Sequence, residues 1–118
     1  MEEVHLIGNL GGDPETRYTK SGNMNVSFSL AVNKKFTDAS GQQQSKTHWY
    51  RCTAWNKQAE TLDKLAQNGW LTKGNQVFVR GDLDFSEWTT QNGESRYTVE
   101  VNVGRLQLCG GKRDDNQN

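Results

Sequence analysis

The chain has 118 residues, a mass of 13.3 kDa and 14 basic residues balanced by 14 acidic ones. This length suits one domain, and no apolar run approaches the roughly 18 residues that a transmembrane helix needs. The polar N-terminus lacks the apolar segment of a secretory signal, and Cys52 and Cys109 are too few to staple a domain. We therefore expect a cytoplasmic domain without disulfides, metals or other cofactors.

The zero net charge hides an uneven distribution of charged residues. Residues 17–80 hold ten basic residues and only three acidic ones, whereas both flanking segments are acidic. A neutral protein can therefore still present a basic face if the middle segments fold onto one surface. On charge alone, solvated surface charge is the simpler interpretation.

Apolar residues at every second position predict strands over most of the chain. Residues 4–10 form the first expected strand and run into a turn at 11–14. Residues 25–32 alternate cleanly, so Val26, Phe28, Leu30 and Val32 share one face. Residues 37–46 have the composition of a loop.

The second half of the chain predicts three more strands and one helix. The strands are expected at residues 47–55, 76–85 and 96–103, the last with Tyr97, Val99, Val101 and Val103 facing inward. The helix is expected at residues 57–67, because apolar residues recur there at helical spacing before the stop signal Asn68-Gly69. The pair Asn92-Gly93 marks a hairpin between the last two strands.

Five strands with one helix between the third and the fourth match an all-β, five-stranded OB-fold barrel. This barrel binds oligonucleotides or oligosaccharides on one sheet face. We place it at residues 1–108 and expect a short disordered tail at 109–118.

The third strand carries the clearest functional signal. Its alternation places Trp49, Arg51, Thr53 and Trp55 on one face, opposite a small, moderately apolar set suited to a barrel interior. A core face would not hold an unpartnered arginine, so this face is expected to meet solvent. Single-stranded nucleic acid would cover its two indoles by base stacking while cations neutralise phosphates. The alternative is that both tryptophans pack in a subunit interface or under a loop.

Three further aromatic residues lie outside this strand. Trp88 lies near the tip of the last hairpin, where it acts as a binding residue or a lid, and Phe36 follows Lys34-Lys35. Trp70, after the helix, is expected to pack against its own barrel. No metal-ligand spacing, phosphate-binding loop or nucleophile motif is present, so we predict no catalytic site and no enzyme activity.

The chain resembles the bacterial single-stranded DNA-binding protein (SSB) family over nearly its whole length. The matching stretches are LIGNLGGDPETRYTKSG (6–22), THWYRCTAWNKQAE (47–60), KGNQVFVRGDL (73–83) and WTTQNGESRYTVEV (88–101). The resemblance implies an OB fold, a homotetramer, and sequence-independent binding of single-stranded DNA in replication, recombination and repair, in association with the nucleoid. The alternatives are a primosome-type or RNA-binding OB-fold protein, or a structural β-barrel oligomer with interface tryptophans.

The resemblance also implies a set of site residues. The stacking aromatics of the family fall on Phe36, Trp49, Trp55 and Trp88, and its phosphate contacts on Arg17, Arg51, Lys57 and Lys73, with Lys34 and Lys35 as neighbours. Two departures stand out. Residues 82–87 are acidic where relatives often carry basic residues, and the acidic-apolar tip through which the family recruits protein partners is absent. We therefore expect single-stranded DNA and further copies of this chain as partners. For the missing tip there are two alternatives: a longer tail has been trimmed, or the protein does not recruit partners in this way.

Overall fold

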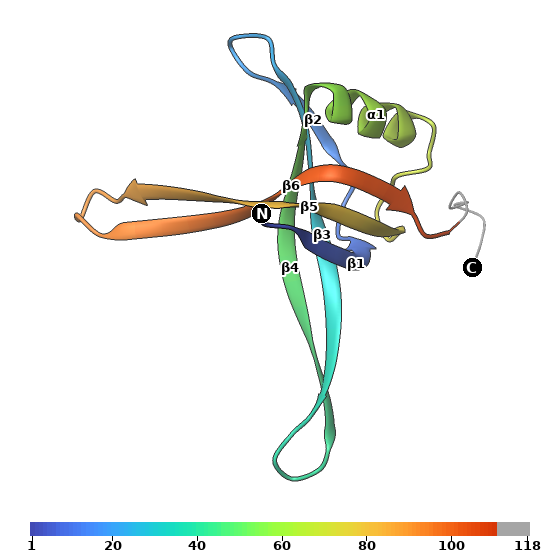
Figure 1. Cartoon of the computed structure of the whole chain (residues 1–118), viewed down its shortest axis with the longest axis vertical. Coiled ribbons are helices and arrows are strands. Elements are labelled where there is room, and N and C mark those ends of the chain that lie inside the picture. The colour runs from blue at the N-terminus through green and yellow to red at the C-terminus, as the bar shows by residue number, and fades with distance from the viewer. Residues whose placement is uncertain (111–118) are drawn as a thin grey trace.

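The computed structural model describes residues 1–110, which form six strands and one helix (Figure 1). In chain order the elements are β1 (Val4–Leu10), β2 (Glu15–Tyr18), β3 (Met24–Thr37), β4 (Gln43–Trp55), α1 (Asn56–Gln67), β5 (Gln76–Thr89) and β6 (Ser95–Leu108). The tail expected at residues 109–118 lies outside the described residues from position 111 on. No helix within residues 1–110 has the length and apolar character needed to cross a lipid bilayer.

Five of these strands close into a barrel. The hydrogen-bonded order is β1-β5-β6-β4-β3-β2, and a further pairing of β1 with β3 closes the ring, leaving β2 outside it. Neighbouring strands run antiparallel except β4 and β6, which pair in parallel. With α1 between the third and fourth strands of the ring, this confirms the predicted all-β OB-fold barrel with one helix.

The barrel interior is built from the inward half of each alternating strand. Val26, Phe28 and Leu30 of β3 are buried, as the alternation predicted. The small residues Cys52 and Ala54 of β4 face the same interior, and burial raises the pKa of the Cys52 thiol to about 12. This thiol therefore stays protonated and serves as a small apolar core residue.

Helix α1 covers one end of the barrel by burying Ala59 and Leu62. It begins one residue before the expected position, directly after Trp55, whose backbone is still extended. It ends where the sequence predicted: Gly69 adopts a positive φ of 80°, and its N–H donates to the Ala66 carbonyl at 3.1 Å. Glycine adopts this left-handed conformation without a steric cost, which explains the stop at Asn68-Gly69.

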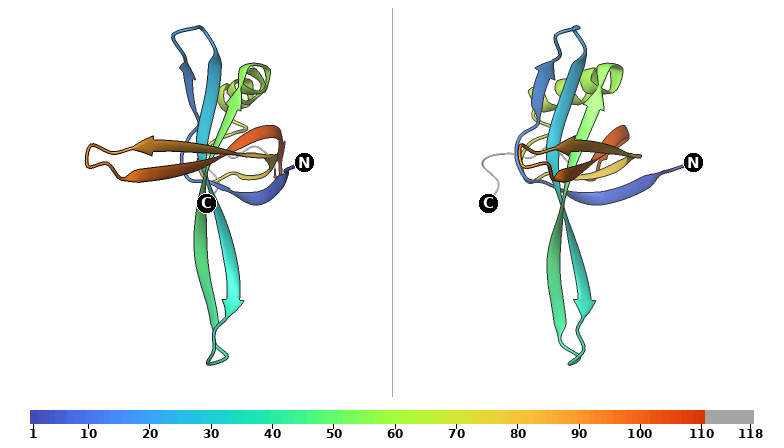
Figure 2. Two further views of the ribbon diagram at one scale, coloured as in Figure 1. Left: turned by 60° about the vertical axis from the view of Figure 1, so that its left-hand side comes forward. Right: turned by 90° about the vertical axis from the view of Figure 1, so that its left-hand side faces the viewer.

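Two long hairpins project from the barrel in different directions (Figure 2). Strands β3 and β4 stay paired out to Thr37 and Gln43, so only residues 38–42 of the expected 37–46 loop lie outside strands. The β3–β4 hairpin extends into solvent, where a two-stranded ladder needs no apolar face. Its polar composition therefore resembled that of a loop.

The outer half of the β5–β6 hairpin is more exposed than the sequence predicted. Val101 and Val103 are buried as predicted, but Tyr97 and Val99 are 69% and 48% exposed. All four alternate along the same face of β6, so the alternation was right, and only the predicted burial of the outer two was wrong. The hairpin extends past the barrel wall there (Figure 1), and no other described element covers it.

The short strand β2 was not predicted. It pairs antiparallel with β3 from Glu15 opposite Ser27 to Tyr18 opposite Met24. All four of its residues are exposed, so it carries no apolar alternation that sequence patterns could detect.

Candidate nucleic-acid interface

The outer face of β4 presents two tryptophans on either side of an arginine. The Trp49 side chain is 63% exposed and Trp55 is 43% exposed, on the face opposite Cys52 and Ala54. Thr53 shares their face but is only 6% exposed, because strands β3 and β6 flank it and it is much shorter than its neighbours Arg51 and Trp55. The predicted division of this strand into an inner and an outer face is otherwise as observed.

Arg51 is held in place by two partners. Its Nη2 donates a hydrogen bond to Ser27 Oγ at 3.1 Å, and its Nε lies 3.3 Å from Glu100 Oε1 of β6. Both side chains of the ion pair are partly exposed, so the pair contributes at most about 1 kcal/mol to stability. The main effect of the two contacts is to fix the guanidinium between the two indoles. The Glu100 carboxylate also offsets part of the positive charge of the guanidinium.

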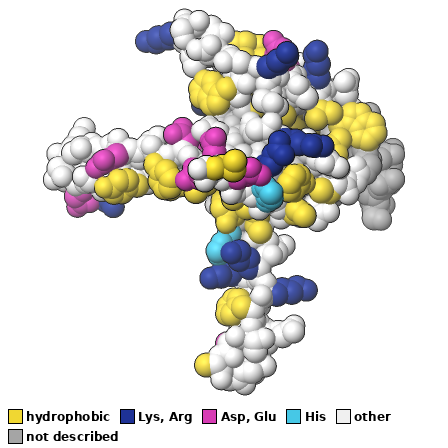
Figure 3. Space-filling view, viewed as in Figure 1, with side chains coloured by type: hydrophobic (Ala, Val, Ile, Leu, Met, Phe, Trp, Pro, Cys, Tyr) yellow, Lys and Arg dark blue, Asp and Glu magenta, His cyan; other side chains and the backbone are white. Residues whose placement is uncertain are grey.

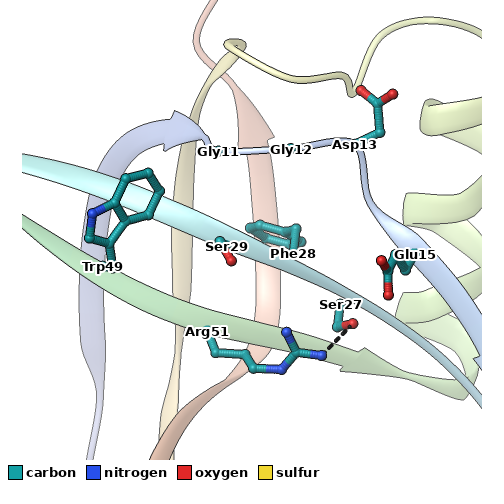
Figure 4. Close-up of a pocket in the computed structure, with 9 residues that line it drawn as sticks. All are labelled: Gly11, Gly12, Asp13, Glu15, Ser27, Phe28, Ser29, Trp49 and Arg51. Atoms are coloured by element: carbon teal, nitrogen blue, oxygen red, sulfur yellow. Dashed lines mark hydrogen bonds between the residues drawn. The ribbon is translucent and has the colours of Figure 1, made fainter.

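A pocket of about 250 Å³ lies beside Trp49 (Figure 4). Trp49 and Arg51 form one side of it, and Gly11 and Gly12 form the opposite side. Ser27 and Ser29 lie between these two sides, and Glu15 lies at the far end, with Asp13 above. Asp13 is engaged elsewhere, since its Oδ1 accepts the Lys73 backbone N–H at 2.8 Å. The volume is below that of a typical drug-sized site, and the nearby carboxylates disfavour a phosphate. The space and its aromatic wall suit part of a nucleobase.

Trp88 lies on the same face of the sheet as Arg51. In the β5–β6 register, Trp88 alternates with Asp84 and Asp82, whose cross-strand partners include Glu100, the ion-pair partner of Arg51. The indole is 51% exposed, and its Nε1 donates to Thr98 Oγ1 at 3.4 Å. The outer face thus continues from β4 across β6 to the hairpin carrying Trp88.

Phe36 is placed differently from the three tryptophans. It alternates with Leu30 and Lys34 on β3, so it lies on the opposite face of the β3–β4 ribbon from Trp49. Its ring is 45% exposed, and Lys46 Nζ lies 5.6 Å from the ring centroid, within cation–π range. A strand reaching both Phe36 and Trp49 must therefore cross an edge or the tip of this hairpin.

The predicted cations divide into two groups. Arg17 and Arg51 form ion pairs with Glu15 and Glu100, whereas the lysines form no ion pair with another described residue: Lys34, Lys35, Lys57 and Lys73. Sequence reasoning missed Lys46, because it assigned that segment to a loop. The register places Lys46 directly opposite Lys34. Two like charges facing each other across strands are unfavourable alone and favour a bound anion.

The charges separate between the two hairpins (Figure 3). Lys and Arg side chains gather along β3–β4, and Asp and Glu side chains along β5–β6. Asp82 and Asp84 are exposed on the face that carries Trp88, as the acidic stretch at 82–87 suggested. Phosphate contacts are therefore expected along β3–β4 rather than β5–β6.

Trp70 keeps 38% of its surface exposed, close to the value for Trp55, and it is absent from the hydrophobic core. The expected packing against the barrel is therefore incomplete.

Within residues 1–110, no three His, Cys, Asp or Glu side chains gather as a metal site would require.

The turn of the β3–β4 hairpin is organised by Asp38. Its carboxylate accepts hydrogen bonds from the Ser40 hydroxyl at 2.7 Å, the backbone N–H groups of Ser40 and Gln42, both at 3.0 Å, and the Gln44 amide at 3.1 Å. The Ser40 hydroxyl bond, followed by those from Gln42 and Gln44, lowers the pKa of Asp38 to about 2 from an ordinary 3.8. These bonds favour the charged form of the carboxyl group.

We expect this turn to keep its order well into acid. A depressed carboxyl pKa gives stabilisation that is present above 3.8 and is lost as the pH falls through about 2. An NMR titration of the Asp38 carboxyl carbon should show its midpoint near 2. Asp38→Ala should speed hydrogen exchange of the Ser40 and Gln42 amides. A midpoint at the ordinary value, or unchanged exchange, would contradict this account of the turn.

Comparison with known proteins gives consistent matches to one family model, one relative and two solved structures. The model of the Single-strand binding protein family matches residues 1–109. Single-stranded DNA-binding protein 1 of Chlorobaculum tepidum is 38% identical over 113 residues, covering 95% of this chain and 67% of the relative.

Two solved structures share the fold. The Plasmodium falciparum SSB complex with ssDNA superposes with a TM-score of 0.78 at 27% identity, covering 93% of this chain and 96% of that one. A deletion mutant of the single-stranded DNA binding protein from Thermus aquaticus gives a TM-score of 0.78 at 31% identity, covering 95% of this chain. This chain spans about half of that protein, 52% of its length.

Proposed function

Because the chain belongs to the single-strand binding protein family, we propose that it binds single-stranded DNA independently of sequence, on the outer face of β4. The observation that carries this proposal is the exposed row Trp49, Arg51 and Trp55, in which two large indoles flank a fixed guanidinium. Paired exposed indoles are costly in water unless a ligand covers them, and stacked bases cover them without reading sequence.

Base stacking supplies much of the proposed affinity. Each base on an aromatic ring contributes about 1–3 kcal/mol, so Phe36, Trp49, Trp55 and Trp88 together give at most roughly 4–12 kcal/mol per subunit. The strand would run along the outer face from Trp55 and Trp49 toward Trp88. Phe36 would receive a separate part of the strand, where it passes the β3–β4 hairpin.

Phosphate contacts supply the salt-dependent share of the affinity. Lys34 and Lys35, joined by Lys46 across the ribbon, form the most concentrated cationic segment, and Lys57, Lys73, Arg17 and Arg51 lie around the barrel. Each phosphate neutralised on a single strand adds about −0.7 to the slope of log K against log salt. Since both arginines are already ion-paired and the β5–β6 hairpin is acidic, we expect stacking to outweigh charge.

We further propose that the protein acts as a homotetramer on DNA in the cytoplasm, protecting single strands during replication, recombination and repair without catalysis. One structural feature supports self-association. Strand β1 pairs with β5 on one side, whereas on the other side Asn9 and Leu10 are its only residues paired with another described strand, β3. Residues 4–7 therefore leave an open edge that includes the exposed Ile7, and such edges are normally covered.

A competition experiment tests the proposed ligand. A fluorescently labelled oligothymidylate is titrated with the protein, and unlabelled single-stranded DNA, duplex DNA and oligouridylate compete for it. We expect single-stranded DNA to compete best and duplex DNA to compete poorly, because stacking needs unpaired bases. Preferred competition by oligouridylate would favour an RNA-binding OB-fold protein. If the labelled strand did not bind, the proposal would fail, and burial of the indoles in a subunit interface would be the favoured alternative.

A further inference from the structure

We propose that Gly11, at the end of β1, is a positioning residue that sets where the Trp49 indole stands on the binding face. This inference rests on the proposed function, since it concerns how one of the stacking rings is presented. The six-membered ring of the indole is directed toward the Gly11 backbone (Figure 4). A Cβ atom at Gly11 would lie 2.5 Å from Trp49 Cζ3 and 3.1 Å from Cη2. The indole thus occupies the space that any other side chain at this position would need.

The backbone at Leu10 and Gly11 is hydrogen-bonded to β3 on one side and to the turn before β5 on the other. The Gly11 N–H donates to the Ser29 carbonyl at 2.9 Å, and the Leu10 N–H donates to the Asn75 carbonyl at 2.9 Å. The Leu10 carbonyl also accepts the Gly74 N–H at 2.8 Å. The segment cannot retreat from the indole without breaking these bonds, so a clash here has to be relieved by the ring.

The requirement for glycine at this position comes from the ring and not from the backbone. Gly11 is not among the glycines with positive φ, so alanine fits its conformation. The next residue offers a natural comparison, because a Cβ at Gly12 would meet nothing within 4 Å. The same substitution at two adjacent glycines therefore differs in one respect, which is contact with Trp49.

A methyl group at Gly11 would displace the indole outward. Restoring an ordinary carbon–carbon contact of about 3.5 Å from the 2.5 Å approach requires the ring to move by about 1 Å. Trp49 is largely exposed, so its ring can move into solvent while the barrel stays intact. The cost appears in DNA binding, because a displaced or mobile ring must be reordered before a base can stack on it.

The test compares Gly11→Ala, Gly12→Ala, Trp49→Ala and the double variant Gly11→Ala/Trp49→Ala by oligothymidylate affinity. We expect Gly11→Ala to weaken binding by roughly three- to tenfold, within the range of coupled neighbours. Gly12→Ala should weaken it less, because Gly12 lines the same pocket but a Cβ there meets no protein atom. In the Trp49→Ala background, Gly11→Ala should have no further effect. Thermal unfolding of each variant reports whether the fold is kept.

Two results would overturn the proposal. One is an equal loss from Gly11→Ala with and without the indole, since the residue would then act on something else. The other is a Gly11→Ala affinity equal to that of the parent protein. If Trp49→Ala itself binds normally, the stacking role of Trp49 has failed, which is a different outcome from a failure of Gly11 alone.

A second background covers the case in which Gly11→Ala alone fails to fold. The smaller side chain of Trp49→Phe lacks the distal indole atoms Cζ3 and Cη2 that meet Gly11. The double variant Gly11→Ala/Trp49→Phe should therefore fold and bind like Trp49→Phe. Failure of this double variant to fold would contradict the assignment, because the clash would then involve atoms other than the indole.

Discussion

Trp49→Ala is expected to weaken binding of a long oligothymidylate by about 1–3 kcal/mol, or roughly 5- to 150-fold, without lowering the unfolding temperature. The indole is 63% exposed on the outer face of β4, so it contributes little to the core and is available to a base. Trp55→Ala should also weaken binding of the oligothymidylate. Equilibrium titration at a fixed salt concentration, together with thermal unfolding of the free variants, measures both quantities.

Tyr97→Ala provides the matched control for these substitutions. Tyr97 is an equally exposed aromatic residue, but it alternates with Val99 and Val101 on the inward-directed face of the β5–β6 hairpin. We expect its removal to leave the affinity unchanged. If Trp49→Ala unfolded the protein, or if Tyr97→Ala cost as much affinity, the assignment of the outer face as the binding surface would be wrong.

Leu30→Ala should show the opposite pattern, a loss of about 2–5 kcal/mol of stability with little change in the affinity of the folded protein. Leu30 is completely buried at the place where the barrel closes, opposite Leu10 of β1 and Tyr50 of β4. Removing it leaves a cavity at this closure, and a loss of this size is a large part of the total stability of a small domain.

Urea unfolding of Leu30→Ala measures this loss, with Val99→Ala as the control. Val99 is an apolar strand residue that is 48% exposed, so its truncation should change stability by no more than about 0.5 kcal/mol. Affinity is measured well below the unfolding transition. A stable Leu30→Ala protein with weakened binding would mean that core and binding face are not separable in the way described.

The sequence was sufficient for the barrel because the relevant signals are local. Alternation located Val26, Phe28 and Leu30 in the core, and Asn68-Gly69 marked the end of α1. Periodicity reports which side of a strand is apolar, but not where the barrel ends. Tyr97 and Val99 show this limit, since they continue the inward face of β6 into a region with no covering layer.

The candidate site was predictable where one strand carries it. The outer face of β4, with Trp49, Arg51 and Trp55, follows from alternation alone. Contacts between strands did not follow, because they depend on register: Glu100 beside Arg51, Lys46 opposite Lys34, and Gly11 beneath the Trp49 ring. The placement of Phe36 on the other face of its hairpin likewise required the β3–β4 pairing.

Titration of intrinsic tryptophan fluorescence with a long oligothymidylate, at low and at high salt, tests the central claim most directly. We expect strong, saturating quenching that largely persists at high salt, because bases stacked on the exposed indoles quench them and stacking is less salt-sensitive than phosphate contact. Trp49→Ala should remove a substantial part of this quenching. Quenching that disappears with salt would mean that charge dominates the affinity, and no quenching at either salt would contradict stacking on this face.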